Sequence, residues 1–296
     1  MPKPPHGAGP NVTLPHVRID SFFDVSEIVH WNPTRRLRPL RRLPLVPARL
    51  FGRTVNNFGD LLGPIIVALM LERSGRPPAT APCRRLLTVG SILHLAQPGD
   101  VVWGSGRNGR VDDDGHRTDH LDVRAVRGPA TRAWLMERGI ACPEVFGDPA
   151  LLLPRLRPDL VELSVRKRHS LTFVSHIDDS PTAGRRGVRA VSPRGDVESL
   201  LRTIVQSEFM VATSLHAVVV AEAFGVPARS VVNRSETEFK YADYYLATNR
   251  ADYRRAATVD EAITLGGERA PDIDLEPLIN AFPIDLFSLE AAEASG

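Results

Sequence analysis

Cysteine, lysine and long apolar runs are all scarce in this chain of 296 residues. Its two cysteines, Cys83 and Cys142, lie far apart and have no His or Cys neighbours at metal-ligand spacing, so they support neither a disulfide framework nor a structural zinc site. The longest unbroken apolar run, over 65–71, is far shorter than the roughly 20 residues that a membrane helix needs. The opening residues MPKPPHGAGP also lack the apolar core of a secretory signal. We therefore expect a cytoplasmic protein without a structural metal.

Charge is unevenly distributed along the chain. Residues 28–59 contain seven arginines and no acid, whereas residues 251–296 contain ten acids and three arginines. The stretch Arg35–Arg53 could pair with the acidic end, or it could contact an anionic partner such as the inner face of a membrane. The net charge of +2 and the lack of aromatic residues among these arginines argue against nucleic-acid binding.

Strand and helix patterns alternate along most of the chain. Residues 1–19 contain five prolines and few apolar residues, so we expect them to be disordered. Strands are predicted at 28–31, 86–89, 101–103, 123–126, 144–146, 171–175, 209–212 and 229–232. Helices are predicted at 60–73, 129–138, 197–206, 215–224, 259–265 and 275–282. The proline-flanked run at 154–158 interrupts the alternation.

This alternation predicts an α/β fold with parallel sheets. We expect two Rossmann-like domains, over 20–157 and 158–250, that face a cleft and bind ligand at the carboxyl ends of their strands. The acidic segment 251–296 is expected to return toward the first domain.

Three strand ends lead through turn-forming residues into a helix, a geometry that directs backbone N–H groups at an anion. The candidate substrate-binding residues at these positions are Asn57, Asp60, Ser105, Gly106 and Ser214. Each has a simpler structural explanation as well, because glycine is common in turns and an aspartate often caps a helix.

Two histidines and one arginine near strand ends could bind a ligand or transfer a proton. His216 falls in the first turn of a predicted helix, where a neutral imidazole is favoured and can donate a hydrogen bond or shuttle a proton. His176 also follows a strand, and either histidine could instead be a packing residue. Arg127 ends a strand before a helix that starts with Pro129, so it could clamp a carboxylate or phosphate, with Arg124 pointing to the opposite face.

These motifs resemble, in order and spacing, the polysaccharide pyruvyl transferases, and more narrowly the branch that makes pyruvate ketals on bacterial exopolysaccharides. The resemblance runs from about residue 55 to residue 246. It rests on Asn57-Phe58-Gly59-Asp60, Val102-Trp103-Gly104-Ser105-Gly106, Val126-Arg127-Gly128-Pro129, Gly147-Asp148-Pro149-Ala150, Phe173-Val174-Ser175-His176, Ser214-Leu215-His216-Ala217, Gly225-Val226-Pro227 and Glu238-Phe239-Lys240-Tyr241.

The resemblance implies a fold of the glycosyltransferase-B kind and a ketal-forming reaction. Phosphoenolpyruvate would be the donor, and a sugar with two nearby hydroxyls, on a polysaccharide or a lipid-linked oligosaccharide, would be the acceptor. No metal and no other cofactor are implied. In this chemistry C3 of the donor is protonated, the two hydroxyls attack the resulting cationic carbon in turn, and phosphate leaves.

The resemblance also assigns roles to single residues. His216 matches the family's histidine and would be the general acid, while Arg127 matches its arginine and would hold the phosphate or carboxylate. Ser214 stands where many members carry the arginine of an Arg-x-His motif. Lys240 or Arg234, both taken as exposed loop residues, could supply the missing charge.

Two other functions fit parts of the sequence. The same architecture could serve a glycosyltransferase that uses a nucleotide sugar, with Glu222 binding the ribose, although a surface position for Glu222 is the simpler interpretation. Alternatively, Arg35–Arg53 could dock a non-catalytic module on an acidic polymer or membrane. That second function leaves the ordered strand-end motifs unexplained.

Overall fold

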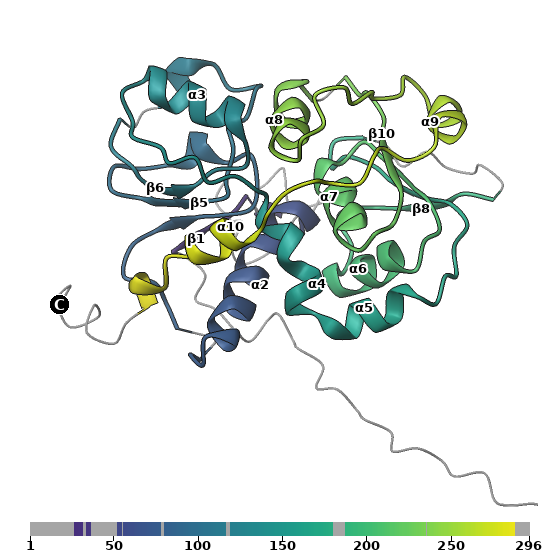
Figure 1. The fold of residues 1–296 in the computed structure, drawn as a ribbon, viewed down its shortest axis with the longest axis horizontal. Coiled ribbons are helices and arrows are strands. Elements are labelled where there is room, and N and C mark those ends of the chain that lie inside the picture. Colours follow the sequence, from purple (N-terminus) through teal and green to yellow (C-terminus); the bar gives the residue numbers. More distant parts are fainter. Residues whose placement is uncertain are drawn as a thin grey trace, which may run out of the picture.

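A computed structural model describes residues 27–31, 34–36, 52–54, 56–77, 80–116, 119–179, 187–234 and 236–287. Within these residues two four-stranded sheets are formed, and every strand pair in both of them is parallel (Figure 1). The first sheet has the order β1 (Ile28–Val29), β4 (Leu86–Leu87), β5 (Val101–Trp103) and β6 (Asp122–Ala125). The second has the order β10 (Ala228–Ser230), β9 (Met210–Ala212), β7 (Thr172–Val174) and β8 (Arg189–Val191). The predicted α/β class is confirmed.

Helices connect the parallel strands. They are α2 (Phe58–Arg73), α3 (Pro129–Glu137), α4 (Leu153–Leu156), α5 (Pro158–Ser164), α6 (Val197–Val205), α7 (Leu215–Ala223), α8 (Phe239–Ala247), α9 (Val259–Leu265) and α10 (Glu276–Asn280). Sequence signals explain several of their ends: Pro129 opens α3, and the side chain of Asp196 accepts a hydrogen bond of 2.7 Å from the backbone N–H of Ser199 at the start of α6. The predicted helices agree with the observed ones to within a few residues.

Several observed elements were not predicted. Among them are β8, whose residues are half-buried or exposed, and the helices α4, α5 and α8. Strand 144–146 was predicted but is reduced to a single bridge between Val126 and Phe146. The pattern of β8 is too polar to indicate a strand without its partner, β7, because an edge strand has only one neighbour.

Helix α2 ties the two sheets together. Its buried residues, among them Phe58, Leu62 and Ile66, belong to one apolar cluster that also contains Val101 of the first sheet and Met210 of the second. α2 contacts both α6 and α7, which cover the second sheet. Burial of this shared surface therefore fixes how the carboxyl ends of the two sheets face each other.

Residues 271–287 return to the first sheet, where α10 contacts β5 (Figure 1). The indole N–H of Trp103 in β5 donates a hydrogen bond of 2.9 Å to the carbonyl of Leu278. The rings of Trp103 and Phe282 meet edge to face, with centroids 5.0 Å apart. The backbone N–H of Cys83 bonds the carbonyl of Leu286 in η6 (Ile284–Phe287) at 2.8 Å.

Part of the arginine-rich stretch forms a small antiparallel pair. Strand β2 (Thr34–Arg36) pairs with β3 (Gly52–Thr54), so that Arg35 lies opposite Arg53 in the ladder. The arginines between them, Arg38 to Arg49, lie outside the described residues, as do residues 1–19. None of the described helices is long and apolar enough to cross a membrane.

The simpler interpretation of Glu222, a surface position, is wrong. Glu222 lies in α7 and is 8% exposed, and its carboxylate accepts two hydrogen bonds of 2.8 Å from Arg250. The hydroxyl of Tyr244 in α8 donates a third, of 2.6 Å. Most of α7 is buried among apolar residues, so the carboxylate of Glu222 needs these hydrogen-bond partners. All of its bonds point into the core, which leaves no ribose-binding role for it.

Removing this carboxylate should strongly destabilise the protein. Glu222→Ala leaves the buried guanidinium of Arg250 without its partner, which costs about 3–5 kcal/mol. Urea denaturation of the purified chain measures the change in the free energy of unfolding. The matched control is Glu276→Ala, because Glu276 pairs with Arg155 at the surface and exposed pairs contribute about 0–1 kcal/mol. Equal losses in both variants would contradict a structural role for the buried pair.

Candidate functional site

A cavity of about 270 Å³ lies at the carboxyl ends of both sheets. The described residues that line it follow β1, β4, β5, β7, β8, β9 and β10, or begin α2. They include six of the nine predicted site residues: Asn57, Asp60, His176, Ser214, His216 and Lys240. The carboxyl edge of parallel strands is where α/β folds bind ligand, so this cavity is the candidate site.

The start of α2 supplies a carboxyl group that keeps its proton near neutral pH. Asp60 is 7% exposed and accepts a hydrogen bond of 2.5 Å from the side-chain amide of Asn57. Burial raises the pKa of Asp60 to about 7, against the opposing effects of the Asn57 hydrogen bond and the charge of Lys240. Asn57, and not Asp60, is the N-cap residue of α2, and Asp60 lines the cavity.

The start of α7 supplies a neutral histidine. Ser214 is the N-cap residue of this helix and makes no side-chain capping bond, and His216 lies in the first turn. Burial, followed by the charges of Lys240 and Arg127, lowers the pKa of His216 to about 3. Its Nε2 is 3.7 Å from Oδ2 of Asp148, too far for a hydrogen bond, and neither atom has another partner. The imidazole is therefore uncharged at neutral pH.

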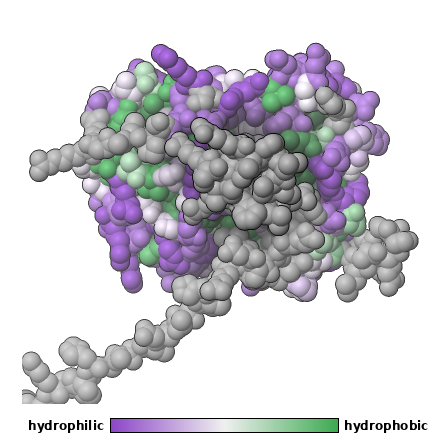
Figure 2. Space-filling model, turned by 180° about the vertical axis from the view of Figure 1, so that it is seen from behind, coloured by the Kyte–Doolittle hydropathy of each residue, from purple (hydrophilic) through white to green (hydrophobic). Residues whose placement is uncertain are grey.

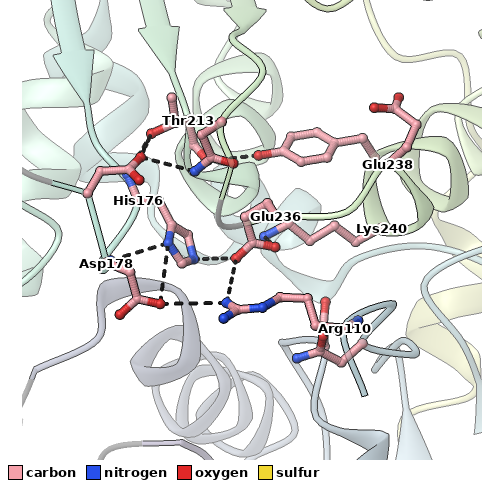
Figure 3. Close-up of polar contacts among 12 residues, drawn as sticks. Arg110, His176, Asp178, Thr213, Glu236, Glu238 and Lys240 are labelled. Carbon is pink, nitrogen blue, oxygen red and sulfur yellow. Dashed lines mark hydrogen bonds and ion pairs between the residues drawn. The ribbon is translucent and has the colours of Figure 1, made fainter. Parts of the chain in front are cut away.

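His176, Glu236 and Lys240 form a connected network on the side of the second sheet (Figure 3). Glu236 accepts a hydrogen bond from Nε2 of His176 and is 2.6 Å from Nζ of Lys240. Burial alone would raise the pKa of Glu236, but the His176 hydrogen bond and the charge of Lys240 outweigh it and lower the pKa to about 2. The backbone N–H of His176 donates to Thr213 Oγ1 at 2.7 Å, which ties the ends of β7 and β9 together.

The sequence predicted Lys240 to be an exposed loop residue, and this prediction is wrong. Lys240 lies in the first turn of α8, and 12% of its side chain is exposed. Burial lowers its pKa, which its ion pair with Glu236 opposes. Lys240 is buried because its helix packs on the core through an aromatic face, formed by the buried side chains of Tyr241, Tyr244 and Tyr245. Arg234, the alternative base, is exposed and does not line the cavity.

The three remaining predicted residues lie beside the cavity without lining it. Arg127 is 1% exposed and donates to Asp243 at 3.0 Å, to Ser91 Oγ at 2.6 Å and to the carbonyl of Arg107 at 3.2 Å. A Cβ atom on Gly106 would lie 2.3 Å from Cζ of Arg127, so glycine makes room for the guanidinium. Ser105 Oγ donates to the carbonyl of Gly90 at 2.9 Å. Arg127 reaches the cavity through Ser91, which lines it, and direct ligand binding by Arg127 stays a prediction.

Sequence reasoning missed four charged residues at the site: Arg110, Asp148, Asp178 and Glu236. Asp148 is fully buried next to His216, and burial raises its pKa to about 6. The spacing of Glu236 and Lys240, four residues apart, is a signal for pairing that becomes visible once α8 is known. Among the described residues there is no group of three or more His, Cys, Asp or Glu that could hold a metal ion.

The raised pKa of Asp60 predicts a pH-dependent stability. In the unfolded chain this carboxyl has a pKa of 3.8, against about 7 in the fold. Its contribution to stability is therefore fully present below about pH 4 and is lost as the pH rises to about 7, because only the unfolded state releases the proton in between. Asp60→Asn should gain stability relative to the wild type over this interval, by up to about 4 kcal/mol. Urea denaturation across the range measures this gain.

The same substitution at an exposed aspartate, Asp114→Asn, is the matched control for the chemical change itself. A difference between wild type and Asp60→Asn that stayed constant across this pH range would show that Asp60 is ionised throughout.

Comparison with known proteins agrees with the motifs of the chain. The family model for polysaccharide pyruvyl transferase matches residues 117–235, which include Arg127, His176 and His216. Among curated proteins, the succinoglycan biosynthesis protein ExoV of Rhizobium meliloti (strain 1021) is 33% identical over 172 residues. These residues are 54% of this chain and 52% of that protein, so the chain spans about half the length of the relative. No solved structure matches the chain. The motifs, the family model and the relative agree: this chain is similar to the polysaccharide pyruvyl transferases.

Proposed function

We propose that this protein transfers a pyruvyl group from phosphoenolpyruvate to two hydroxyls of one sugar, forming a pyruvate ketal and releasing phosphate. The acceptor is a polysaccharide or lipid-linked oligosaccharide, in keeping with a relative named for succinoglycan biosynthesis. The two parallel sheets would be the cores of two Rossmann-like domains in a glycosyltransferase-B-like arrangement. The proposal requires no metal and no cofactor besides the donor.

One observation carries the proposal: the cavity combines a protonated carboxyl with a buried cation. Asp60 keeps a proton up to about pH 7, and Lys240 lines the same cavity. Protonation of an enol carbon needs an acid that is still protonated near neutral pH. Binding of a donor with a carboxylate and a phosphate needs positive charge. Both requirements are met in one place.

The proton balance of the reaction suits a single acid and base. C3 of phosphoenolpyruvate takes one proton, and the two attacking hydroxyls release two in all, one for each C–O bond formed at C2. One proton therefore returns to the acid, and the other leaves with the phosphate. Asp60, with a pKa of about 7, can give the first proton as a carboxyl and take one back as a carboxylate.

His216, which the resemblance implies as the general acid, would instead be the second proton carrier, because its lowered pKa leaves it neutral while Asp60 in the same cavity holds a proton. A neutral imidazole has one N–H donor and one acceptor nitrogen, so it can pass a proton between a hydroxyl and another group. Its Nε2 has no hydrogen-bond partner within the described chain, which leaves this atom able to bond a substrate. The N-termini of α2 and α7 meet the same cavity and favour an anionic ligand.

We also propose a cytoplasmic location, with peripheral contact to the inner face of the membrane through Arg35–Arg53. The support is the excess of arginine in this stretch. Such contact would bring a lipid-linked acceptor to the cavity.

Ligand binding tests the donor directly. Phosphoenolpyruvate should raise the thermal stability of the full chain, because a ligand at about 100 times its dissociation constant adds about 2.7 kcal/mol to the free energy of unfolding. UDP and GDP sugars at the same concentration should not. Stabilisation by a nucleotide sugar alone would instead support a glycosyltransferase and contradict the proposal.

Substitution of the two proton carriers should slow turnover more than it weakens donor binding. His216→Ala and Asp60→Asn each remove a group that handles a proton in the transition state, so kcat should fall about 10²- to 10⁴-fold. Phosphate release from phosphoenolpyruvate in the presence of sugar diols measures kcat, and calorimetry measures donor affinity, which should stay within a few-fold. His169→Ala, at a histidine away from the cavity, is the control. Near-normal turnover in His216→Ala would exclude His216 from proton transfer.

A further inference from the structure

Two basic residues are found among the described residues that line the cavity, Lys240 and Arg110, and they differ in how firmly they are held. Lys240 is 2.6 Å from its carboxylate partner, Glu236. Arg110 approaches Asp178 at 3.6 Å and Glu236 at 3.9 Å, and both distances exceed a hydrogen bond. Its side chain is 47% exposed. A loose, exposed pair of this kind contributes about 0–1 kcal/mol, so Arg110 can exchange it for another anion.

The backbone of Arg110 is nevertheless held firmly. The preceding residue, Gly109, packs so closely on the second half of the chain that a Cβ atom there would lie 2.3 Å from Thr237 Oγ1 and 2.8 Å from Cβ of Phe239. The guanidinium of Arg107 lies between the rings of Trp134 and Phe239, 5.2 Å and 5.1 Å from their centroids. The loop after β5 is thus docked on the segment before α8, and the side chain of Arg110 extends toward Asp178 and Glu236 (Figure 3).

Among the described residues, the other cations near the cavity, Arg127 and Lys240, already have carboxylate partners. Arg127 is paired with Asp243 at 3.0 Å, with both side chains buried. Lys240 is paired with Glu236. A donor that carries a carboxylate and a phosphate adds at least two negative charges, which these neutralised pairs do not balance. Arg110 is the described lining residue whose positive charge is free to turn to the donor.

We propose that Arg110 binds the phosphate group of the donor, an inference that rests on the proposed function. The guanidinium leaves Asp178 and makes two parallel hydrogen bonds to phosphate oxygens, a geometry that arginine suits. Asp178 is 41% exposed and is hydrated when it loses this partner. The half-exposed position of Arg110 also lets the phosphate depart to solvent with few groups to displace. The carboxylate of the donor is left to the N-termini of α2 and α7, which meet the same cavity.

Calorimetric titration of the full chain with three probes tests this assignment: phosphoenolpyruvate, inorganic phosphate and pyruvate. Arg110→Ala should weaken binding of phosphoenolpyruvate and phosphate about 10- to 100-fold, because a hydrogen-bonded charge is lost, and should change pyruvate binding less than about twofold. Arg110→Lys keeps the charge without the planar fork and should lie between Arg110→Ala and the wild type. Arg166→Ala, which removes an exposed arginine outside the cavity, should match the wild type.

The outcomes separate this inference from the proposed function. If the wild type binds phosphoenolpyruvate and Arg110→Ala binds it equally well, Arg110 is not a donor ligand and the proposed function stands. If Arg110→Ala loses pyruvate binding and keeps phosphate binding, the assignment to phosphate is wrong. Equal weakening in Arg166→Ala would reduce the effect to net charge and overturn a specific contact. If the wild type does not bind phosphoenolpyruvate, both proposals fail.

Discussion

The cost of burying charge where the two sheets meet governs much of this structure. A buried ion without a partner costs several kcal/mol, so each charged group drawn into the junction must be paired or lose its charge. Arg127 meets Asp243, and Arg250 meets Glu222, and all four side chains are almost completely buried. Asp243 also accepts from the backbone N–H of Thr131 at 2.9 Å and from its hydroxyl at 2.6 Å. These bonds hold α8 against α3 and so set the position of the cavity wall that α8 provides.

Two titratable groups in the cavity avoid the cost of a buried charge by losing their charge. Asp60 and His216 have no oppositely charged partner at hydrogen-bond distance in the described chain, and burial therefore favours their neutral forms. Both groups line the same cavity, where a neutral carboxyl and a neutral imidazole could each exchange a proton with a ligand near pH 7. Glu236 remains ionised because His176 and Lys240 both contact it. The ionised groups around the cavity are thus paired, whereas Asp60 and His216 are held in their neutral forms.

Figure 2 shows the hydropathy of the surface on the side opposite to that seen in Figure 1. Hydrophilic residues dominate its outline, with apolar residues scattered among them, as expected of a chain whose core runs continuously between its sheets. The loop that carries Arg110 is fixed by the close approach of Gly109 to Thr237 and Phe239.

Two sequence signals, hydrophobic periodicity and position at strand ends, predicted the fold class and many of the residues at the candidate site. The alternation of short apolar runs with amphipathic stretches sufficed for the α/β class and for helices such as 197–206, because strand and helix patterns depend on local spacing. The same reasoning located Asn57, Asp60, His176, Ser214 and His216, since the carboxyl ends of parallel strands converge whatever the loops contain. Tertiary structure alone decided which charges are paired. Arg127 and Asp243 are 116 residues apart, and Arg110 meets Asp178 and Glu236 only because the two sheets share a core. Burial, which sets the protonation of Asp60 and His216, is a property of the packed molecule and has no local signal in the sequence.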